Sequence, residues 1–155
     1  MRAVVQRVLS ARVVVDGEVI GAIGRGLLVF AGFSPTDDDA VLGWVAKKCA
    51  QLRVFSDADG KMNRSVIDEG GELLIVSQFT LYGDTRKGNR PGFGAAALPD
   101  VAKPMYERFC ALASRELGRP VQAGRFGADM KVELANDGPV TLWIEREAEP
   151  ARSVP

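Results

Sequence analysis

The stretch ELLIVSQFTLYGD, residues 72–84, decides how the rest of the chain is read. It begins with an apolar run at residues 73–76, directly after the turn residues 68–71. A short aliphatic and β-branched run after such a turn predicts a buried β-strand. The strand ends in Ser77, Gln78, Phe79 and Thr80. Polar groups at a strand end are either ordinary turn residues or part of a site, and both readings stay open.

Length and composition indicate an ordinary globular protein. The chain has 155 residues, of which 46% are hydrophobic and 26% are charged, and a chain of this length buries roughly 70% of its unfolded surface. Its 20 basic and 20 acidic residues cancel, whereas a protein that coats long stretches of nucleic acid is usually basic. Any RNA contact is therefore expected to be local. We expect a cytoplasmic protein, because the start of the chain lacks an apolar signal segment and the longest apolar run is too short for a membrane span.

The chain contains no histidine, which excludes much of the usual catalytic chemistry. Ser-His-Asp and Cys-His machinery and histidine-ligated zinc are all ruled out. Cys49 and Cys110 fall in predicted helices without the spacing of a metal site, so we expect reduced core residues. We therefore expect no cofactor and no metal, and proton transfer through carboxylates, main chain, water or the substrate.

Two acidic stretches could suggest a metal site. Asp37, Asp38 and Asp39 precede a helical pattern, where they either compensate the helix dipole, with Thr36 as the N-cap, or form a triple-aspartate metal site. Residues 57–60 resemble part of a calcium loop, but the closing glutamate of such a loop would fall on a valine. We interpret this second stretch as a turn.

The order of the elements predicts an α+β domain. Strands are expected over residues 3–15, 18–23, 27–33, 54–55, 73–76, 121–124, 130–134 and 140–144, with helices ending near residues 52 and 117. Asp16-Gly17 between two strands predicts a type I′ hairpin. The short connections favour antiparallel pairing, so we expect a single domain, residues 1–147, in which two main helices pack on an antiparallel, curved, barrel-like sheet. Residues 148–155 are expected to form a C-terminal tail.

A loop rich in glycine and proline, residues 84–98, carries the only local basic cluster: Arg86, Lys87 and Arg90. Such a loop is either a solvated connector or an arm that contacts phosphates.

Gly138-Pro139 separates the last two predicted strands. A cis bond before proline costs only about 0.5–1 kcal/mol, and it would turn neighbouring carbonyl oxygens the same way, where they could hold an ammonium group. The residues alone favour a simple trans turn.

Together, two of these stretches resemble a known family. Residues 77–81 (SQFTL) and residues 136–141 (NDGPVT) resemble the paired signatures of the D-aminoacyl-tRNA deacylases, also called the D-tyrosyl-tRNA deacylase family. Residues 6–8, 55–63, 84–88 and 124–130 share the likeness, which therefore extends along the chain. The resemblance is weaker at Gly83, Asn89 and Gly92, in or beside the basic loop.

The resemblance implies a homodimeric hydrolase whose substrate is the acceptor end of an aminoacyl-tRNA. It cleaves the ester between a D-amino acid, or glycine, and the terminal adenosine, which is a proofreading step in translation. Gly138-Pro139 would be cis and would enter the pocket of the partner subunit, giving a cross-subunit active site. Its carbonyl oxygens would bind the substrate ammonium, and an L side chain would find no room.

The resemblance also assigns roles to the other site residues. Main-chain N–H groups near Phe79 and Thr80 would stabilise the oxyanion, while Ser77 and Gln78 would shape the adenosine and ester pocket. The ribose 2′-hydroxyl would help to activate water; a covalent role for Thr80 is the rival, although no base lies beside it in the sequence. The remaining expected site residues flank the bend or steer the acceptor end: Asn136, Val140 and Thr141, and Arg86, Lys87 and Arg90.

Overall fold

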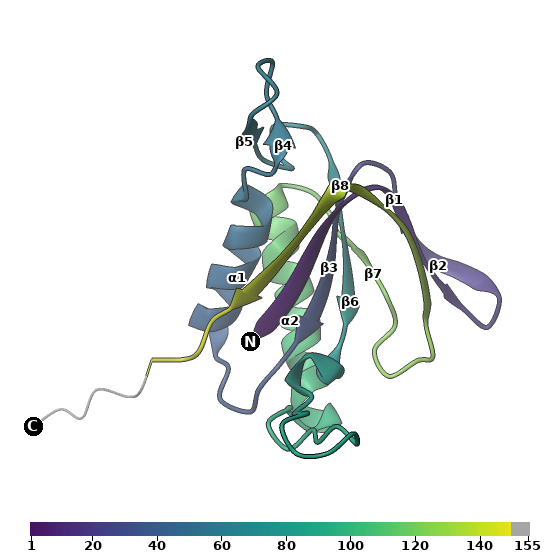
Figure 1. Ribbon diagram of the computed structural model, residues 1–155, viewed down its shortest axis with the longest axis vertical. Helices are drawn as coiled ribbons and strands as arrows, with labels where there is room; N and C mark the ends of the chain where they lie inside the picture. Colours follow the sequence, from purple (N-terminus) through teal and green to yellow (C-terminus); the bar gives the residue numbers. More distant parts are fainter. Residues whose placement is uncertain (150–155) are drawn as a thin grey trace, which may run out of the picture.

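The computed structural model describes residues 1–149, and one long strand organises it (Figure 1). The strand β1 pairs along its length with β8, while its other edge is shared by β3 and β2. The elements are β1 (Arg2–Val15), β2 (Glu18–Ile23), β3 (Gly26–Gly32), α1 (Asp39–Gln51), β4 (Phe55–Ser56), β5 (Met62–Arg64), β6 (Glu72–Ser77), the 3₁₀ helix η1 (Phe79–Tyr82), α2 (Pro99–Leu117), β7 (Gln122–Ala123) and β8 (Lys131–Glu145).

The main sheet is mixed, so the expectation of an antiparallel sheet is wrong in part. Strands β1, β2, β3 and β8 pair antiparallel, but β6 runs parallel to both of its neighbours, β3 and β7. Parallel partners need long crossovers. Here α1 and the β4–β5 hairpin connect β3 to β6, and α2 lies between β6 and β7. The expected curved, barrel-like sheet with two main helices is confirmed.

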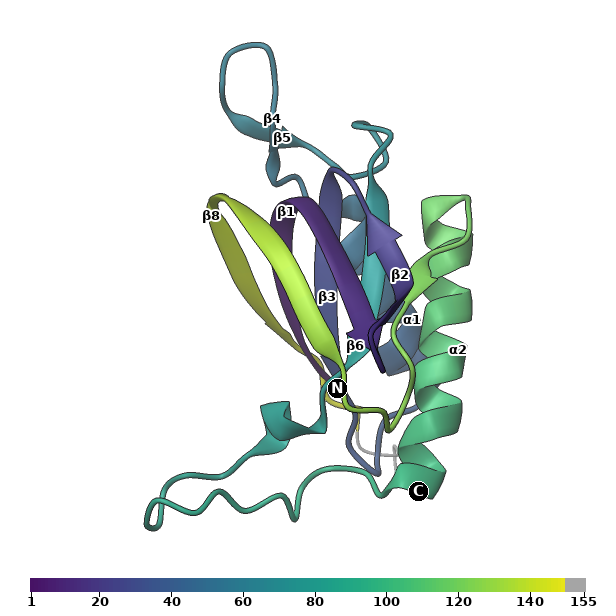
Figure 2. The same ribbon diagram turned by 90° about the vertical axis from the view of Figure 1, so that its right-hand side faces the viewer.

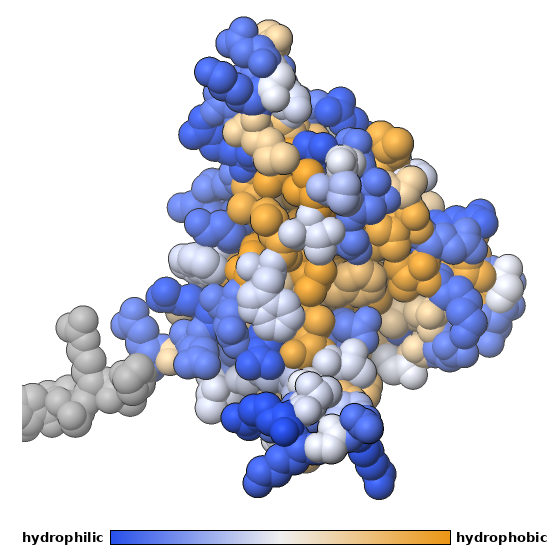
Figure 3. Space-filling view, viewed as in Figure 1, coloured by the Kyte–Doolittle hydropathy of each residue, from blue (hydrophilic) through white to orange (hydrophobic). Residues whose placement is uncertain are grey.

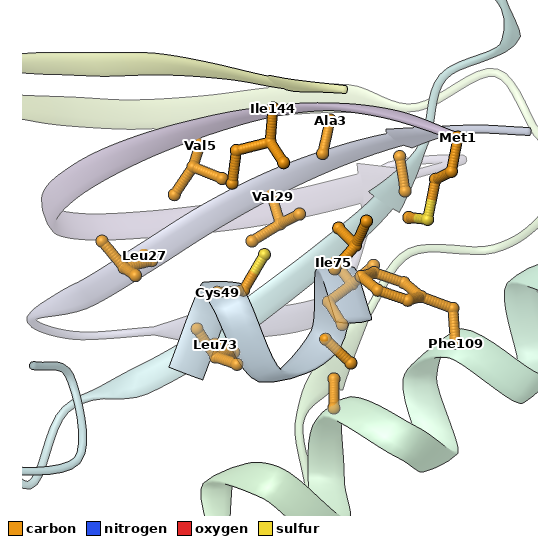
Figure 4. Packing of buried hydrophobic residues seen from close by; sticks show 14 of the residues in the cluster. Met1, Ala3, Val5, Leu27, Val29, Cys49, Leu73, Ile75, Phe109 and Ile144 are labelled. Carbon is orange, nitrogen blue, oxygen red and sulfur yellow. The ribbon is translucent and has the colours of Figure 1, made fainter. Parts of the chain in front are cut away.

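Strand β6 is buried on both faces, which explains its continuous apolar run. Leu73 and Ile75 join the core between the sheet and the helices, where Figure 4 shows Ile75 near Phe109 of α2. Leu74 and Val76 point the other way, into the core enclosed by the curled sheet. The strand that leads to the predicted site is therefore held from both sides.

The sheet nearly closes between β2 and β7. A Cβ atom added to Gly21 of β2 would lie 2.7 Å from the carbonyl oxygen of Ala123 in β7. The two main chains therefore approach directly, although no ladder joins them. The Asp16-Gly17 hairpin that leads into β2 has the positive φ angles, 51° and 80°, of a type I′ turn, as predicted.

The start of α1 differs from the sequence prediction. Its N-cap is Asp38, whose Oδ1 accepts from the main-chain N–H of Val41 at 2.9 Å, so the expected cap at Thr36 is wrong. The helix begins at Asp39, because residues 34–37 form a turn of their own.

The other two aspartates also have separate partners. Asp37 is buried and accepts from the Met1 ammonium at 2.6 Å, and Asp39 pairs with Arg108 of α2 at 2.8 Å. Within residues 1–149, no cluster of three or more histidine, cysteine, aspartate or glutamate side chains could hold a metal ion. Local hydrogen bonding and ion pairing account for the acidic run.

Helix α2 begins at Pro99 and ends at Gly118, whose φ of 79° makes a left-handed cap. Pro104 lies inside the helix, beyond its first turn. Tyr106, Phe109 and Leu112 face the core.

Neither α1 nor α2, the two α-helices of the described residues, combines the length and the hydrophobicity that a membrane-spanning helix needs.

The two ends of the sheet carry different projections (Figure 2). The β4–β5 hairpin extends from one end, and the loop that follows η1 extends from the opposite end. Ala148, which was expected in the tail, is half-buried against the core, and residues 150–155 of that tail lie outside the described residues.

Gly26→Ala is expected to destabilise the protein strongly. A Cβ atom at Gly26 would collide with the main chain of Glu72, where the parallel ladder between β3 and β6 begins. We expect the free energy of unfolding to fall by about 3 kcal/mol or more, since a buried main chain cannot yield as a side chain can.

Urea denaturation followed by circular dichroism measures the effect. Gly43→Ala in α1 is the matched control, because a Cβ there meets nothing within 4 Å, and it should stabilise the helix by about 0.5–1 kcal/mol. Equal stabilities of the two variants would contradict this account of the β3–β6 contact.

Candidate functional site

A cavity of about 530 Å³ opens where β6 ends. Ser77, Gln78 and Phe79 line it from the strand end, as predicted, whereas Thr80 is not part of its lining. The other walls come from the loop before α2, the first turns of α2, the segment after β7 and β8: Phe93, Leu98, Ala102, residues 126–130 and Val132. The polar strand end is therefore one wall of a largely apolar pocket.

The main chain changes direction at Gln78. Its N–H still donates to Ala31 of β3 at 2.7 Å, which continues the parallel ladder. The first hydrogen bond of η1 then runs from Leu81 N–H to the carbonyl oxygen of Gln78 at 3.3 Å. The N–H groups of Phe79 and Thr80 precede that bond, and the first N–H groups of a helix have no acceptor within it. Two main-chain N–H donors that have no acceptor within η1 thus lie at the strand end that forms one wall of the cavity.

The Thr80 hydroxyl lacks the surroundings of a nucleophile. Its Oγ1 accepts a hydrogen bond from Nε2 of Gln78 at 2.5 Å, and the side chain is exposed. An amide N–H is a donor and cannot take the hydroxyl proton.

The basic loop closes on itself beside the cavity. Asp84 and Gly92 exchange two main-chain hydrogen bonds of 2.7 and 2.9 Å. The three predicted basic residues line a second hollow of about 580 Å³ together with Asp84 and Gly92. The Phe79 ring also meets Phe93 of this loop edge-on, with centroids 5.1 Å apart. The loop is thus attached to the wall of the cavity.

The three basic side chains differ electrostatically. Arg86 forms a two-point ion pair with Asp84, at 2.6 and 2.9 Å, and its guanidinium lowers the pKa of that carboxyl to about 2. Within the described chain, Lys87 and Arg90 form no ion pair. Arg86 is therefore engaged in an ion pair within the loop, while the charges of Lys87 and Arg90 stay unpaired among the described residues.

Gly138-Pro139 is a cis peptide, so the trans turn favoured by the residues alone is wrong. It also does not join two separate strands as predicted. Strand β8 pairs with β1 both before and after this peptide bond. Gln6 pairs with Thr141 and Val8 with Asn136, so two residues of advance along β1 correspond to five residues along β8. The motif is a bulge in one long strand, and residues 137–140 have no ladder partner.

The bulge is fastened at its base. Asn136 accepts from the main-chain N–H of Val140 and donates to Thr141 Oγ1, both at 3.1 Å. Arg7 of β1 donates to the carbonyl oxygen of Asp137 at 3.2 Å and to that of Val54 at 2.6 Å.

Gly138 and Pro139 themselves are exposed at the tip of the bulge. A Cβ added to Gly138, whose φ is 118°, would lie 2.7 Å from the Arg7 guanidinium. The exposed tip of the bulge is therefore held in place by the hydrogen bonds that Asn136 and Arg7 make at its base.

One chain does not bring the two motifs together. Across the sheet, Asn136 pairs with Val8, Val8 with Gly26, and Gly26 with Glu72. Glu72 is the first residue of β6, whereas Ser77 is the last residue of that strand. The bulge therefore lies at the end of the sheet remote from the cavity (Figure 1), and residues 136–141 do not line the cavity.

Several lining residues were missed by the sequence reasoning. Residues 126–130 belong to a stretch that contributed to the resemblance, but no periodicity or charge pattern gave them a role. Among the described residues, Asp129 is the only charged one in the cavity lining, and its carboxylate pairs with Lys131 at 2.8 Å. Phe93 and Leu98 come from the Gly/Pro loop, where sequence offers no signal for contact with a distant strand.

Comparisons with known proteins assign the family. A family described as D-Tyr-tRNA(Tyr) deacylase matches residues 4–145. The chain belongs to this family. A D-aminoacyl-tRNA deacylase of Parabacteroides distasonis is 53% identical, over 95% of this chain and 98% of the relative. One of Chlorobaculum parvum is 56% identical, over 94% of this chain and 97% of the relative. The enzyme class expected from the sequence is therefore confirmed.

Two solved structures share the fold. A structure titled c-Myc DNA Unwinding Element Binding Protein superposes with a TM-score of 0.88 at 44% identity, covering 96% of this chain and 100% of the other. A probable eukaryotic D-amino acid tRNA deacylase superposes with a TM-score of 0.79 at 20% identity, over 92% and 97% of the chains. The second likeness supports the fold alone.

Arg7→Met should loosen the bulge and destabilise the protein. The change removes charge-assisted hydrogen bonds to Asp137 and Val54 from a side chain that is only 11% exposed. We expect the free energy of unfolding to fall by about 2–4 kcal/mol, since each such bond contributes about 1.5–3 kcal/mol.

Arg12→Met on the same strand is the matched control, measured by urea denaturation. Arg12 pairs with Glu133, and both side chains are 53% exposed, so its removal should cost less than about 1 kcal/mol. A smaller loss for Arg7→Met than for Arg12→Met would show that the Arg7 contacts do not brace the bulge.

Proposed function

We propose that this chain hydrolyses the ester between a D-amino acid and the 3′-terminal adenosine of tRNA in the cavity at the end of β6. The observation that carries the proposal is the pairing of two N–H donors, on Phe79 and Thr80, with a largely apolar pocket in a member of this deacylase family. Ser77 and Gln78 form the wall against which the adenosine and the ester lie.

The two N–H groups stabilise the oxyanion that forms when water attacks the ester carbonyl. They belong to the main chain, so no rotamer has to be frozen when the charge develops. Loss of one such donor typically costs about 2.7–4 kcal/mol of transition-state stabilisation.

The substrate supplies part of the acid–base chemistry. The chain has no histidine to act as a general base. The Thr80 hydroxyl accepts a hydrogen bond from the Gln78 amide, and the Asp129 carboxylate at the cavity is exposed and paired with Lys131. The ribose 2′-hydroxyl next to the ester lies close enough to the reacting carbonyl to orient and activate the attacking water. No cofactor takes part in this scheme.

A second copy of the chain completes the site. The exposed Gly138-Pro139 bulge enters the partner's cavity, where its free carbonyl oxygens accept from the substrate ammonium. Two such bonds contribute on the order of 3–6 kcal/mol. Exposed apolar side chains on β8, Leu134 and Trp143, support an interface on this face, where Figure 3 shows apolar surface.

The bulge also accounts for chirality. With the ammonium held by main-chain oxygens, an L side chain is directed into the wall formed by Gly138 and Pro139, while a D side chain points away from it. Val140 and Thr141 support that wall from behind. Glycine has no side chain to reject, so its ester is also a substrate.

Lys87 and Arg90 contact phosphates of the acceptor end, with Arg86 holding the loop in shape. Only a few phosphates are contacted, which fits the zero net charge. Single-strand contacts weaken with a slope of about −0.7 per phosphate in a plot of log affinity against log salt. The cytoplasm is the proposed location, because charged tRNA is found there.

D-Tyr-tRNA and L-Tyr-tRNA, incubated separately with the purified protein, test the stereochemistry. We expect the D-ester to be hydrolysed at least about a hundredfold faster, which corresponds to about 2.8 kcal/mol of discrimination. Release of the labelled amino acid measures both rates. Equal rates, or no release of either amino acid, would defeat the proposal.

Thr80→Ala should keep substantial activity, within about tenfold of wild type, because its main-chain N–H survives the change. Single-turnover hydrolysis of D-Tyr-tRNA measures the effect, and Thr36→Ala, an exposed threonine outside the site, is the control. Complete loss of activity with intact folding and tRNA binding would instead identify Thr80 as a nucleophile.

A further inference from the structure

The hydroxyl of Tyr106 holds two main-chain carbonyls next to the cavity. The side chain lies on α2 and is only 5% exposed. Its hydroxyl donates to the carbonyl oxygen of Ile75 at 2.8 Å and lies 3.3 Å from that of Gly124. Burial raises the pKa of the phenol far above its usual range, so the hydroxyl keeps its proton.

Both carbonyls lie just before a wall of the cavity. Ile75 directly precedes Val76, the first lining residue of β6, and Gly124 lies two residues before Phe126, the first residue of the wall after β7. Ala102, one helical turn before Tyr106 on α2, lines a third wall. One hydroxyl therefore fixes the relative positions of all three.

We propose that Tyr106 is a positioning residue for ester hydrolysis, which sets the distance between the Ser77 wall and the wall formed by residues 126–130. The inference rests on the proposed function, because it assumes that this cavity holds the acylated end of tRNA. Tyr106 acts through its neighbours and does not touch the substrate.

The hydrogen bonds show which wall depends on the hydroxyl. The Ile75 carbonyl also accepts from the N–H of Gly124 at 2.9 Å, so it keeps a partner if the hydroxyl is removed. Within residues 1–149, the Gly124 carbonyl has no other donor. Loss of the hydroxyl therefore leaves the partly buried Gly124 carbonyl, at the start of the wall after β7, without a donor among the described residues. Phe126 belongs to this wall, and its ring centroid lies 6.0 Å from that of Tyr106. A shift of the wall therefore moves the Phe126 ring as well.

Tyr106→Phe tests the inference, because it removes the hydroxyl and keeps the ring. We expect kcat for D-Tyr-tRNA to fall about tenfold, while KM changes less than about twofold, since the basic loop that binds tRNA is untouched. The ratio of the rates for D-Tyr-tRNA and D-Ala-tRNA should also change at least about threefold, because the larger tyrosine side chain makes more contacts with the displaced wall than alanine does.

Ser114→Ala is the matched control. Ser114 is on the same helix, and its hydroxyl also anchors the β7 segment, by accepting from Val121 N–H at 3.1 Å and donating to the Cys110 carbonyl at 2.9 Å. Its contacts lie before β7, away from the cavity. Its removal should lower stability comparably but leave kcat and the rate ratio at the wild-type values.

Hydrogen exchange of the main-chain amides in residues 124–130 provides a readout independent of turnover. Measured well below the melting temperature, exchange should quicken in Tyr106→Phe and stay unchanged in Ser114→Ala. Unchanged exchange, kcat and rate ratio in folded Tyr106→Phe overturn the inference. The same losses in both variants overturn it too, since they indicate a general structural role.

Ala128→Trp separates this inference from the proposed function. The indole fills the cavity, of which Ala128 is a wall residue, and should abolish turnover while the chain stays folded. Wild-type turnover by this variant overturns the cavity as the reaction site, and with it the role of Tyr106. Loss of turnover in Ala128→Trp together with a wild-type Tyr106→Phe overturns only the role of Tyr106.

Discussion

The parallel pairing of β6 between β3 and β7 is the constraint on which the rest of the structure depends. Both edges of β6 are paired, and its two faces lie in two separate hydrophobic cores. The strand therefore cannot rotate or slide without exposing apolar side chains of one of these cores. The chain leaves this strand at Gln78, while that residue still donates to β3. The N–H groups of Phe79 and Thr80 thus directly follow a strand that is paired on both edges and buried on both faces. Donors fixed in this way are what electrostatic stabilisation of a transition state requires.

Much of this could be predicted from local sequence. The apolar run of β6, the Asp16-Gly17 hairpin and the two helices each have short-range signals, and the structure contains all of them. The parallel direction of β6 has no such signal, because a continuous apolar run is compatible with any strand that is covered on both faces. Direction depends on the path of α1 and α2 over the sheet. Likewise, Phe93 and residues 126–130 reach the cavity only through tertiary packing.

The bulge shows a different limit of sequence reading. Glycine and proline in succession predict a turn that reverses the chain, and the alternating residues on both sides fit two paired strands. In the structure both segments pair with β1 instead, so the extra residues have to leave the sheet without reversing the chain. The guanidinium of Arg7 then donates to the carbonyl oxygen of Asp137, which the ladder no longer serves. The sequence places Arg7 far from residue 137, and only the pairing with β1 reveals the connection.

The geometry of one chain argues for the proposed assembly. The bulge and the cavity lie at opposite ends of the same sheet, so no side-chain movement within one chain can join them. The proposed homodimer resolves this with a two-fold axis, which would set each bulge against the strand end of its partner and form both sites at once. The rigidity of the sheet then has a chemical meaning. It fixes the distance between two main-chain elements, one that offers N–H donors and one that offers carbonyl acceptors. In the proposed mechanism, a chain without histidine binds the ammonium through carbonyl oxygens and the developing oxyanion through N–H groups, and the acid–base step is left to the substrate's own hydroxyl.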